Sequence, residues 1–564
     1  MRESDEASFG AVSSEVTIAA LMIIWLALVA GVARVASRIT IFNAGRFIEF
    51  DLRNELYAKL TGLGPKFFAS MPTGDLTSRA ANDVTFVRVL FALPFLHVIN
   101  ASLAYAIALR KMLALDVWLT VICLLPYPVL LFVVRRVIRA MFEQTKIVQE
   151  HLAKISSRVQ ENLTGMHVVK TYVLEERERR RFYGVNNGFV SKNMRLALYR
   201  GGLTALMSLM AGAGTLLVLL IGSRRVVEGS LDLGQFVEFN GYVVALAFPT
   251  LAMGWVFSVW HRGLAAFDRI TEVLDTVPEI TTGTQPPHSA ERGVGAEVVF
   301  DDVSFAYPDG SVALEHVSLR IPAGSTVAFV GRTGSGKTTL VKLLSRFYDP
   351  TSGQIRLDGV ALSELQLRDM RSEFGVVSQG PFLFSMSIAN NLRFGLDALQ
   401  HDDTVHRAAP TTSLEAGEAA ADQDERIDQA LRIAGLESDI DGFPSGLATL
   451  VGERGITLSG GQKQRVTIAR ALLVDPRILV LDDALSSVDT KTEAAILDHL
   501  ESVMSGRTSV LVTHRFNALP RVDRIFVLDH GRIIEEGTHD DLLAIGGTYA
   551  AMWARQQLAE ALDE

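Results

Sequence analysis

Eight consecutive residues have the spacing of a phosphate-binding loop. The pattern G-x-x-x-x-G-K-[ST] is met by Gly331, Arg332, Thr333, Gly334, Ser335, Gly336, Lys337 and Thr338. An apolar run precedes the loop and a helix-like run from Thr339 follows it, which is the strand–loop–helix context that the motif needs. We expect the glycines and the helix N-terminus to wrap phosphate, with Lys337 at the β- and γ-phosphates and the Thr338 hydroxyl on Mg²⁺. Thr339 is included among the expected nucleotide-binding residues.

A second short segment has the same physical character. It follows Leu458 and consists of Ser459, Gly460, Gly461 and Gln462, after which a helical stretch begins. Ser459 is expected to cap that helix, and the two glycines let the backbone approach a phosphate closely. The segment is therefore a second candidate phosphate contact.

The loop and the serine–glycine segment together resemble the ATP-binding cassette (ABC) ATPases, and the resemblance covers the chain from about residue 17 to its C-terminal region. It implies that ATP and Mg²⁺ are bound, and that the Ser459–Gln462 signature of one cassette completes the ATP site of another, head to tail. Since this chain contains one cassette, a dimer of cassettes is implied.

Other parts of the family's site match at single positions. Asp482 follows the apolar run 478–481, which reads as a strand buried on both faces, and the resemblance makes it the Walker B carboxylate that acts on Mg²⁺. Two of the matches have plain structural alternatives: a lone histidine such as His514 is more often a core residue, and an aromatic beside proline such as Tyr307 is common in turns. The resemblance implies further roles: Gln379 contacts Mg²⁺ and faces the membrane domain, residues 486–489 form the D-loop, His514 contacts the γ-phosphate, and Tyr307 stacks on adenine.

Position 483 departs from the family pattern, because active cassettes carry glutamate there as the general base and this chain carries Asp483. Aspartate is one methylene shorter, and a misplacement of about 1 Å costs on the order of 10²-fold in rate. We therefore expect the site built on this chain's own P-loop to bind ATP well and hydrolyse it slowly. The alternative is that the loop shifts and Asp483 works nearly as well. An intact signature beside this aspartate resembles the degenerate half of bacterial heterodimeric multidrug exporters.

The composition excludes some classes of function. The chain has 564 residues, 49% of them hydrophobic, and its formal net charge of −9 gives no indication of nucleic-acid binding. Its single cysteine, Cys123, excludes a disulfide framework and a cysteine metal site. Residues 451–455 resemble an exporter segment that touches the membrane domain, with a flexible polar loop as the alternative.

The N-terminal half contains five candidate membrane spans, and the Lys and Arg residues of 38–88 and 135–200 place those stretches on the cytoplasmic side. An odd number of spans puts the N-terminus outside, whereas six are expected from the family. Either the true start lies upstream, or the subunit lacks the first family helix. The five spans are predicted at about 17–37, 89–109, 114–134, 203–222 and 236–258.

The expected fold is a multi-domain chain: an all-α polytopic transmembrane domain of the ABC exporter type 1, followed by an α/β P-loop nucleotide-binding domain. We divide it into a transmembrane domain at 1–270, a linker at 271–296 and a cassette at 297–564, with an insertion at 396–425 that is expected to be disordered. Segments around 73–81 and 168–175 are candidate coupling helices that dock on cassettes.

The resulting hypothesis is a half-transporter of an ATP-driven exporter in the cytoplasmic membrane. Its expected partners are a second ABC half-transporter, membrane lipid and a small amphipathic substrate such as a drug or lipid. Two alternatives stay open: a non-hydrolysing regulatory subunit of a transporter complex, and a homodimeric lipid or peptide exporter.

Overall fold

The computed structural model describes residues 2–288, 293–400, 425–452, 458–488 and 490–563. The chain divides into two compact units, which are considered one at a time. The first unit contains residues 1–61 and 73–276, and the second contains residues 62–72 and 277–564. The expected boundary near residue 270 therefore falls a few residues later, at the end of a long helix.

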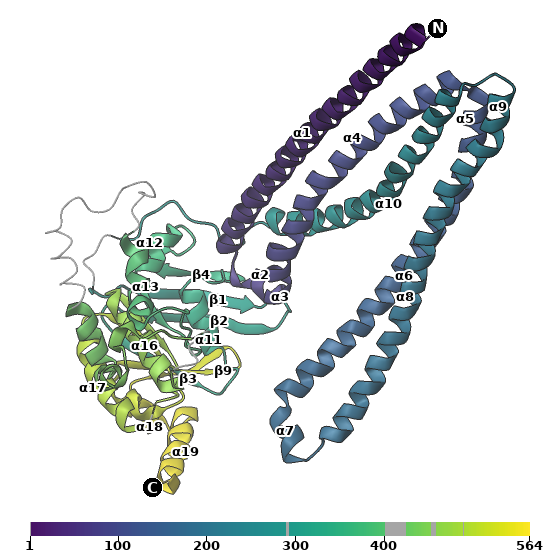
Figure 1. The fold of residues 1–564 in the computed structure, drawn as a ribbon. Helices are drawn as coiled ribbons and strands as arrows, with labels where there is room; N and C mark the ends of the chain where they lie inside the picture. Colours follow the sequence, from purple (N-terminus) through teal and green to yellow (C-terminus); the bar gives the residue numbers. More distant parts are fainter. Residues whose placement is uncertain (1, 289–292, 401–424, 453–457, 489, 564) are drawn as a thin grey trace. The chain divides into compact units, whose positions relative to one another are not determined.

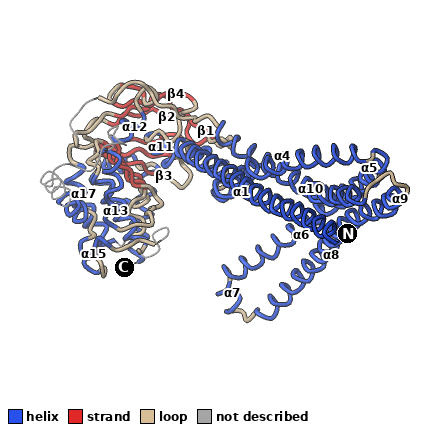
Figure 2. The backbone as a smooth tube through the Cα atoms, turned by 45° about the horizontal axis from the view of Figure 1, so that its top comes forward, coloured by secondary structure: helices blue, strands red, loops and turns tan. Residues whose placement is uncertain are grey.

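Every described element of the first unit is helical (Figure 2). Helix α4 packs along α10, and α6 packs along α8 with the short α7 between them (Figure 1). The elements are α1 (Arg2–Gly62), α3 (Thr73–Ser78), a π-helical turn (Arg79–Asp83), α4 (Val84–Leu115), α5 (Val117–Leu124), α6 (Pro126–Thr164), α7 (Met166–Thr171), α8 (Glu175–Leu217), a second π-helical turn (Val218–Gly222), α9 (Ser223–Val227) and α10 (Leu233–Asp275).

Two stretches of the described residues are long and apolar enough to cross a membrane, Val16–Gly62 and Thr73–Leu115. They contain the predicted spans at 17–37 and 89–109. The spans predicted at 203–222 and 236–258 coincide with helical residues of α8, its π-helical turn and α10. Their membrane crossing stays a prediction.

The stretch 114–134, predicted as a span, is divided among the end of α4, α5 and the start of α6, and its membrane crossing stays a prediction. Asp116 has an extended backbone, and its carboxylate accepts a hydrogen bond from the Leu119 N–H at 3.0 Å, which ends α4 and caps α5. Pro126 then begins α6. An N-cap aspartate and a first-turn proline both favour a new helix start over continuation.

The second unit is built on two sheets. Its six-stranded sheet has the order β10-β9-β3-β8-β7-β6 and is parallel except for β10. All residues of β7 are buried, which confirms the strand predicted over 478–481. The strands are β3 (Thr326–Gly331), β6 (Phe374–Val377), β7 (Ile478–Asp482), β8 (Thr508–Val512), β9 (Arg524–Asp529) and β10 (Arg532–Gly537).

The smaller sheet is antiparallel, with the order β2-β1-β4-β5. It consists of β1 (Val298–Ala306), β2 (Val312–Ile321), β4 (Ser352–Leu357) and β5 (Val360–Ala361). The helices of this unit are α2 (Pro65–Ser70), α11 (Lys337–Leu344), α12 (Leu367–Ser372), α13 (Ile388–Gln400), α15 (Glu437–Gly442), α16 (Gly460–Leu473), α17 (Thr490–Met504), α18 (His539–Ile545) and α19 (Thr548–Asp563).

The predicted linker runs along the cassette. The Gly283 N–H donates to the Leu365 carbonyl and the Gln285 N–H to the Glu364 carbonyl, both at 2.9 Å. A Cβ at position 283 would lie 2.1 Å from the Glu364 backbone, so only glycine fits this contact. The described part of the linker is therefore fixed to the cassette surface.

The first coupling-helix candidate, 73–81, covers α3 and the start of the π-helical turn in the helical unit, and its docking on a cassette stays a prediction. Arg79 in that segment hydrogen-bonds the Arg269 carbonyl and Glu272 of α10, within the helical unit. The segment that belongs to the cassette's unit is 62–72, which contains α2, and Lys66 forms an ion pair with Glu279. The second candidate, 168–175, covers most of α7 and the turn that leads into α8.

Three predicted segments lie partly outside the described residues. They are the insertion at 396–425, of which 401–424 are not described, the exporter segment at 451–455, of which 453–455 are not described, and the D-loop, of which Asp489 is not described. Residues 396–400 of the predicted insertion belong to α13.

Candidate nucleotide-binding site

The predicted site residues gather at one edge of the six-stranded sheet. The P-loop leaves β3, Asp482 ends β7, His514 follows β8 and Gln379 follows β6. These four strands are parallel, with β8 and β7 lying between β3 and β6. Their carboxyl ends therefore lie at the same edge, where ligands of open α/β sheets bind.

The P-loop backbone is possible only with glycine at two of its positions. Gly331 and Gly336 have φ of 149° and 106°. Added Cβ atoms would lie 2.2 Å from the Leu528 carbonyl oxygen and 2.7 Å from the Ala313 carbonyl oxygen, respectively. The loop backbone therefore lies in close contact with β9 and β2, and helix α11 begins directly after the loop.

Lys337 is buried, and its ammonium donates to the carbonyls of Gly331 and Arg332 at 2.8 and 2.9 Å. Burial lowers the pKa of Lys337, while the nearby Asp482 and Asp483 carboxylates oppose that change. The ammonium therefore sits inside the loop that would surround a phosphate.

Asp482 and Thr338 supply two oxygen atoms at one point, because the Thr338 hydroxyl donates to Asp482 Oδ1 at 3.4 Å. Burial is the main cause that raises the pKa of the Asp482 carboxyl. Within the described residues, no group of three or more His, Cys, Asp or Glu side chains could hold a metal. Two oxygen ligands fit Mg²⁺, which usually keeps waters and substrate phosphate oxygens as its other ligands.

Asp483 is half-buried, and its backbone is fixed in the left-handed region with φ of 51°. Its N–H donates to the Val512 carbonyl at 2.7 Å, and its carbonyl accepts from the Ser486 N–H at 3.3 Å. The exposed Gln379 side chain donates to Asp483 Oδ2 at 3.4 Å. The structure thus brings together the two residues that were predicted to act on water and metal.

Tyr307 lies next to the helix that follows the P-loop. Its hydroxyl lies 3.0 Å from the Thr339 hydroxyl, which explains why Thr339 is buried here. The ring packs edge-on against Phe305 and Tyr348, with centroids 5.0 and 5.7 Å apart. An aromatic cluster therefore borders the P-loop helix on this side.

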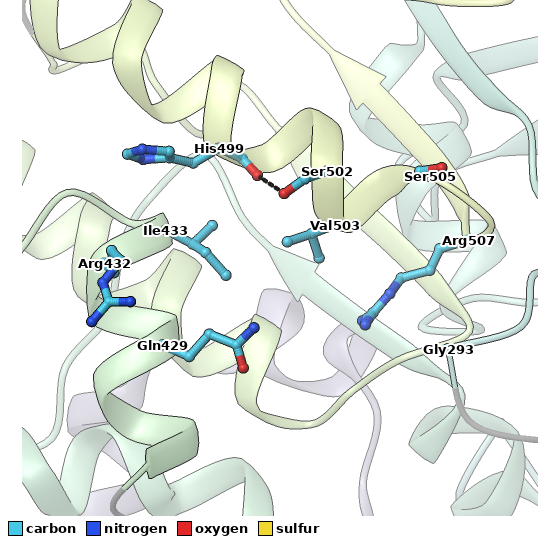
Figure 3. A pocket seen from close by; sticks show the side chains of 9 residues that line it. All are labelled: Gly293, Gln429, Arg432, Ile433, His499, Ser502, Val503, Ser505 and Arg507. Atoms are coloured by element: carbon cyan, nitrogen blue, oxygen red, sulfur yellow. Dashed lines mark hydrogen bonds between the residues drawn. The ribbon is translucent and has the colours of Figure 1, made fainter.

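His514 is exposed and lines a cavity of about 490 Å³ together with Gly331, Arg332 and Thr333. Residues of α19, including Met552 and Arg555, complete its wall. A separate cavity of about 450 Å³ lies at the C-terminal turns of α17 and includes His499 and Ser502 (Figure 3). None of the predicted site residues lines that second cavity.

The signature begins α16 as predicted. Ser459 caps the helix: its hydroxyl accepts from the Gln462 N–H at 3.2 Å, and the Gln462 side chain accepts from the Ser459 N–H at 2.9 Å. The observed helix starts at Gly460, three residues before the expected start at Lys463, because Ser459 is the N-cap and the two glycines are the first helical residues.

Three further residues at this edge were not predicted. Gln464 of α16 is buried and hydrogen-bonds the D-loop residues Ser486 and Ser487. Arg515, next to His514, contacts the D-loop and the buried Glu493. The only signal in the sequence was the position of Arg515 beside the histidine, because its contacts depend on the fold.

Comparison with known proteins places the chain in a family. The ABC transporter profile matches residues 314–486, and the profile of the ABC transporter transmembrane region matches residues 3–250. Because the two matches together cover most of the chain, the protein belongs to the ABC transporter family. It is a multi-pass membrane protein of the exporter type, with a cytoplasmic ATP-binding domain that couples ATP hydrolysis to transport.

The similarity to individual relatives extends over nearly the whole length of this chain. The chain is 37% identical to the multidrug resistance-like ATP-binding protein MdlA of Escherichia coli (strain K12), over 96% of this chain and 87% of that protein. It is 32% identical to the ATP-dependent lipid A-core flippase of Syntrophus aciditrophicus (strain SB), over 94% and 84%. The solved structure of a bacterial Atm1-family ABC exporter with ATP bound matches with a TM-score of 0.75 and 28% identity, over 92% and 87%.

Proposed function

We propose that this chain is a half-transporter that pairs with a second, different ABC half-transporter, and that its own P-loop forms the slower of two ATP sites. ABC exporters dimerise, so the shared sites follow from the family. The observation that supports different hydrolysis rates at the two sites is the fixed position of Asp483 beside Asp482.

The surroundings of Asp483 bear on whether its loop could shift to compensate for the missing methylene. Its N–H is held at 2.7 Å by the carbonyl of Val512, at the end of the neighbouring strand β8. A shift of the loop by about 1 Å toward the attacking water would stretch this hydrogen bond beyond hydrogen-bonding range. The bond therefore opposes such a shift, and the Asp483 carboxylate stays too far from the water. A rate loss on the order of 10²-fold follows.

The remaining proposed roles are those that the family implies, and the positions of the side chains at one sheet edge support them. Lys337 would bind the β- and γ-phosphates, Tyr307 would stack on adenine, and His514 would contact the γ-phosphate. Thr338 and Asp482 would hold Mg²⁺ with Gln379 nearby; the ion would neutralise charge that develops on the β- and γ-phosphate oxygens.

The proposed cargo is an amphipathic drug or lipid moved across the cytoplasmic membrane. Support comes from relatives whose names include multidrug resistance and a lipid A-core flippase.

The proposal is tested by two substitutions in the assembled transporter. Ser459→Asp keeps an N-cap side chain but sets a carboxylate against the partner site's phosphate, so ATP turnover should fall more than about tenfold. Asp483→Asn changes only the slow site, so turnover should stay within about twofold.

Other outcomes support the alternatives. A homodimer with two identical sites would lose most of its turnover with either substitution. A non-hydrolysing regulatory subunit would leave the turnover of the complex unchanged in both cases. Circular dichroism of each variant provides the check that the fold is retained.

A further inference from the structure

Arg515, in the segment that follows β8, connects this segment to the D-loop. Its Nη1 donates to the Val488 carbonyl and its Nη2 to the Ser486 carbonyl, both at 3.0 Å. Because the planar guanidinium has a rigid arrangement of donors, the two carbonyls are held at a fixed separation from each other and from Arg515. The residue before it is His514, which lines the P-loop cavity.

The guanidinium is itself anchored by a buried carboxylate. Nη1 also pairs with Glu493, in the first turn of α17, whose side chain is 5% exposed. The Arg515 side chain is 33% exposed, and a charge-assisted bond to a buried carboxylate together with two carbonyl bonds restricts its orientation. The anchor therefore fixes Arg515, and through it the backbone on either side of Ser487.

The same loop is held from its other side by the signature helix. The side-chain amide of Gln464 donates to the Ser486 hydroxyl and its carbonyl oxygen accepts from the Ser487 N–H, both at 2.9 Å. Gln464 is 1% exposed. At Gly461 an added Cβ would lie 2.9 Å from the Ser487 carbonyl oxygen, so the signature backbone packs directly on the loop.

We propose that Gln464 and Arg515 are positioning residues that couple the two ATP sites of the dimer through Ser486–Val488. This inference rests on the proposed head-to-tail function, in which Ser459–Gln462 serves the partner's nucleotide and His514 serves this chain's own. A displacement of the signature helix when nucleotide binds is passed by hydrogen bonds to the D-loop, and from there to the residue next to His514.

A purely structural role for Arg515 predicts a different pattern, and the chain offers a matched control. Arg521 lies on the same segment after β8 and pairs with Asp498 and Glu501 of the same helix, α17. Within the part of the chain that the structure describes, both of these partners belong to α17 and neither belongs to the D-loop. If Arg515 only fastens this segment to α17, then equivalent changes at the two arginines should have equivalent effects.

The experiment uses the purified, assembled transporter with Arg515→Lys and Arg521→Lys. Lysine keeps a cation for the carboxylates but cannot reach two carbonyls with a planar fork. Arg515→Lys should lower kcat for ATP at least about fivefold with KM within about twofold, whereas Arg521→Lys should leave both unchanged. Equal kcat values for the two variants, or a change confined to KM, would overturn the proposal.

A double-mutant cycle then tests the connection itself. Gln464→Ala and Arg515→Lys each loosen one side of the same loop, so the double variant should lose little more kcat than the worse single variant. Multiplicative losses would mean that the two residues act separately, and would refute the coupling. A fully inactive Gln464→Ala is replaced by Gln464→Glu, which keeps an acceptor for the Ser487 N–H.

The proposed function is scored separately with Ser459→Asp in the same preparations. If Ser459→Asp leaves turnover unchanged, the head-to-tail function fails whatever Arg515 does. If Ser459→Asp blocks turnover and the arginine pair behaves alike, only the coupling fails.

Discussion

Two neighbouring aspartates with different surroundings define the nucleotide site at the scale of single residues. Asp482 is buried beside Lys337 and Thr338, whereas Asp483 is half-buried and faces Gln379. In the proposed function, the first holds a cation and the second acts on water. The methylene that is missing at position 483 would then set how fast the site works.

Asp482→Asn should stabilise the cassette when no nucleotide is bound. Burial raises the pKa of Asp482, so the native state binds more protons than the unfolded chain, and stability falls as pH rises through this interval. The Asn variant lacks that cost, and its melting temperature at neutral pH should rise by about 2–4 °C, or about 1 kcal/mol.

Differential scanning fluorimetry across pH measures this effect. Addition of Mg²⁺ and ATP should stabilise the wild type more than the variant, which lacks the carboxylate for the cation. A variant that melts below the wild type without nucleotide would contradict the assignment of Asp482 as a destabilised, buried carboxylate.

Single residues also show what sequence can and cannot predict. The P-loop, Asp482 and Ser459 belong to local patterns whose chemistry is set by near neighbours in the chain, and the structure places them at the expected element ends. The pairing of Arg515 with Glu493 spans 22 residues and depends on how β8 and α17 pack. No periodicity in the sequence encodes that contact.

At the scale of elements, the two signature glycines have different structural surroundings. A Cβ at Gly461 would lie 2.9 Å from a D-loop carbonyl, but one at Gly460 would make an ordinary contact of 3.6 Å with the Ser487 Cβ. Gly461→Ala should therefore destabilise the cassette by about 1–3 kcal/mol through overpacking.

Gly460→Ala is the matched control and should have the opposite sign. Alanine in a helix gains roughly 0.5–1 kcal/mol over glycine where the space is open. Thermal unfolding of the nucleotide-free protein separates the two variants. Equal shifts would show that the D-loop does not press on α16.

The helical unit is joined internally by an ion pair between a half-exposed arginine and a buried carboxylate. Arg269 of α10 donates two hydrogen bonds, of 2.8 and 2.6 Å, to Asp83, which is 4% exposed. Arg269→Ala leaves a buried carboxylate without these two donors and should destabilise this unit by about 1–3 kcal/mol. Thermal unfolding in detergent, followed by circular dichroism, is the measurement.

Lys170→Ala is the control for that prediction. It removes an ion pair with Glu175 in which both side chains are exposed, so the thermal unfolding should stay nearly unchanged. Similar losses for the two variants would show that the buried Asp83 carboxylate does not depend on Arg269.

The elements also show which parts of the fold could be predicted from the sequence and which could not. The helices at 17–37 and 89–109 follow from apolar length alone. The break at Asp116 requires knowing that its carboxylate turns back to the Leu119 N–H, and the assignment of 62–72 to the cassette depends on contacts such as Lys66 with Glu279. Those contacts are made between segments far apart in the chain.

At the scale of the whole molecule, a covalent route leads from α10 through residues 277–288 into the cassette. Since Gly283 and Gln285 of this segment are hydrogen-bonded to residues 364–366, we expect movement of the cassette to reach α10 through a restrained connection. ATP held in a slow site would keep the cassettes associated while the faster site completes several cycles.

The lifetime of intact ATP at the slow site tests this account most directly. The assembled transporter is loaded with γ-labelled ATP, freed of unbound nucleotide, and chased with unlabelled ATP while bound ATP and ADP are separated over time. The account predicts that about one ATP per dimer survives for many steady-state turnovers, and that Asp483→Glu shortens its lifetime on the order of tenfold or more. Conversion of all bound ATP at the steady-state rate in the wild type would contradict it.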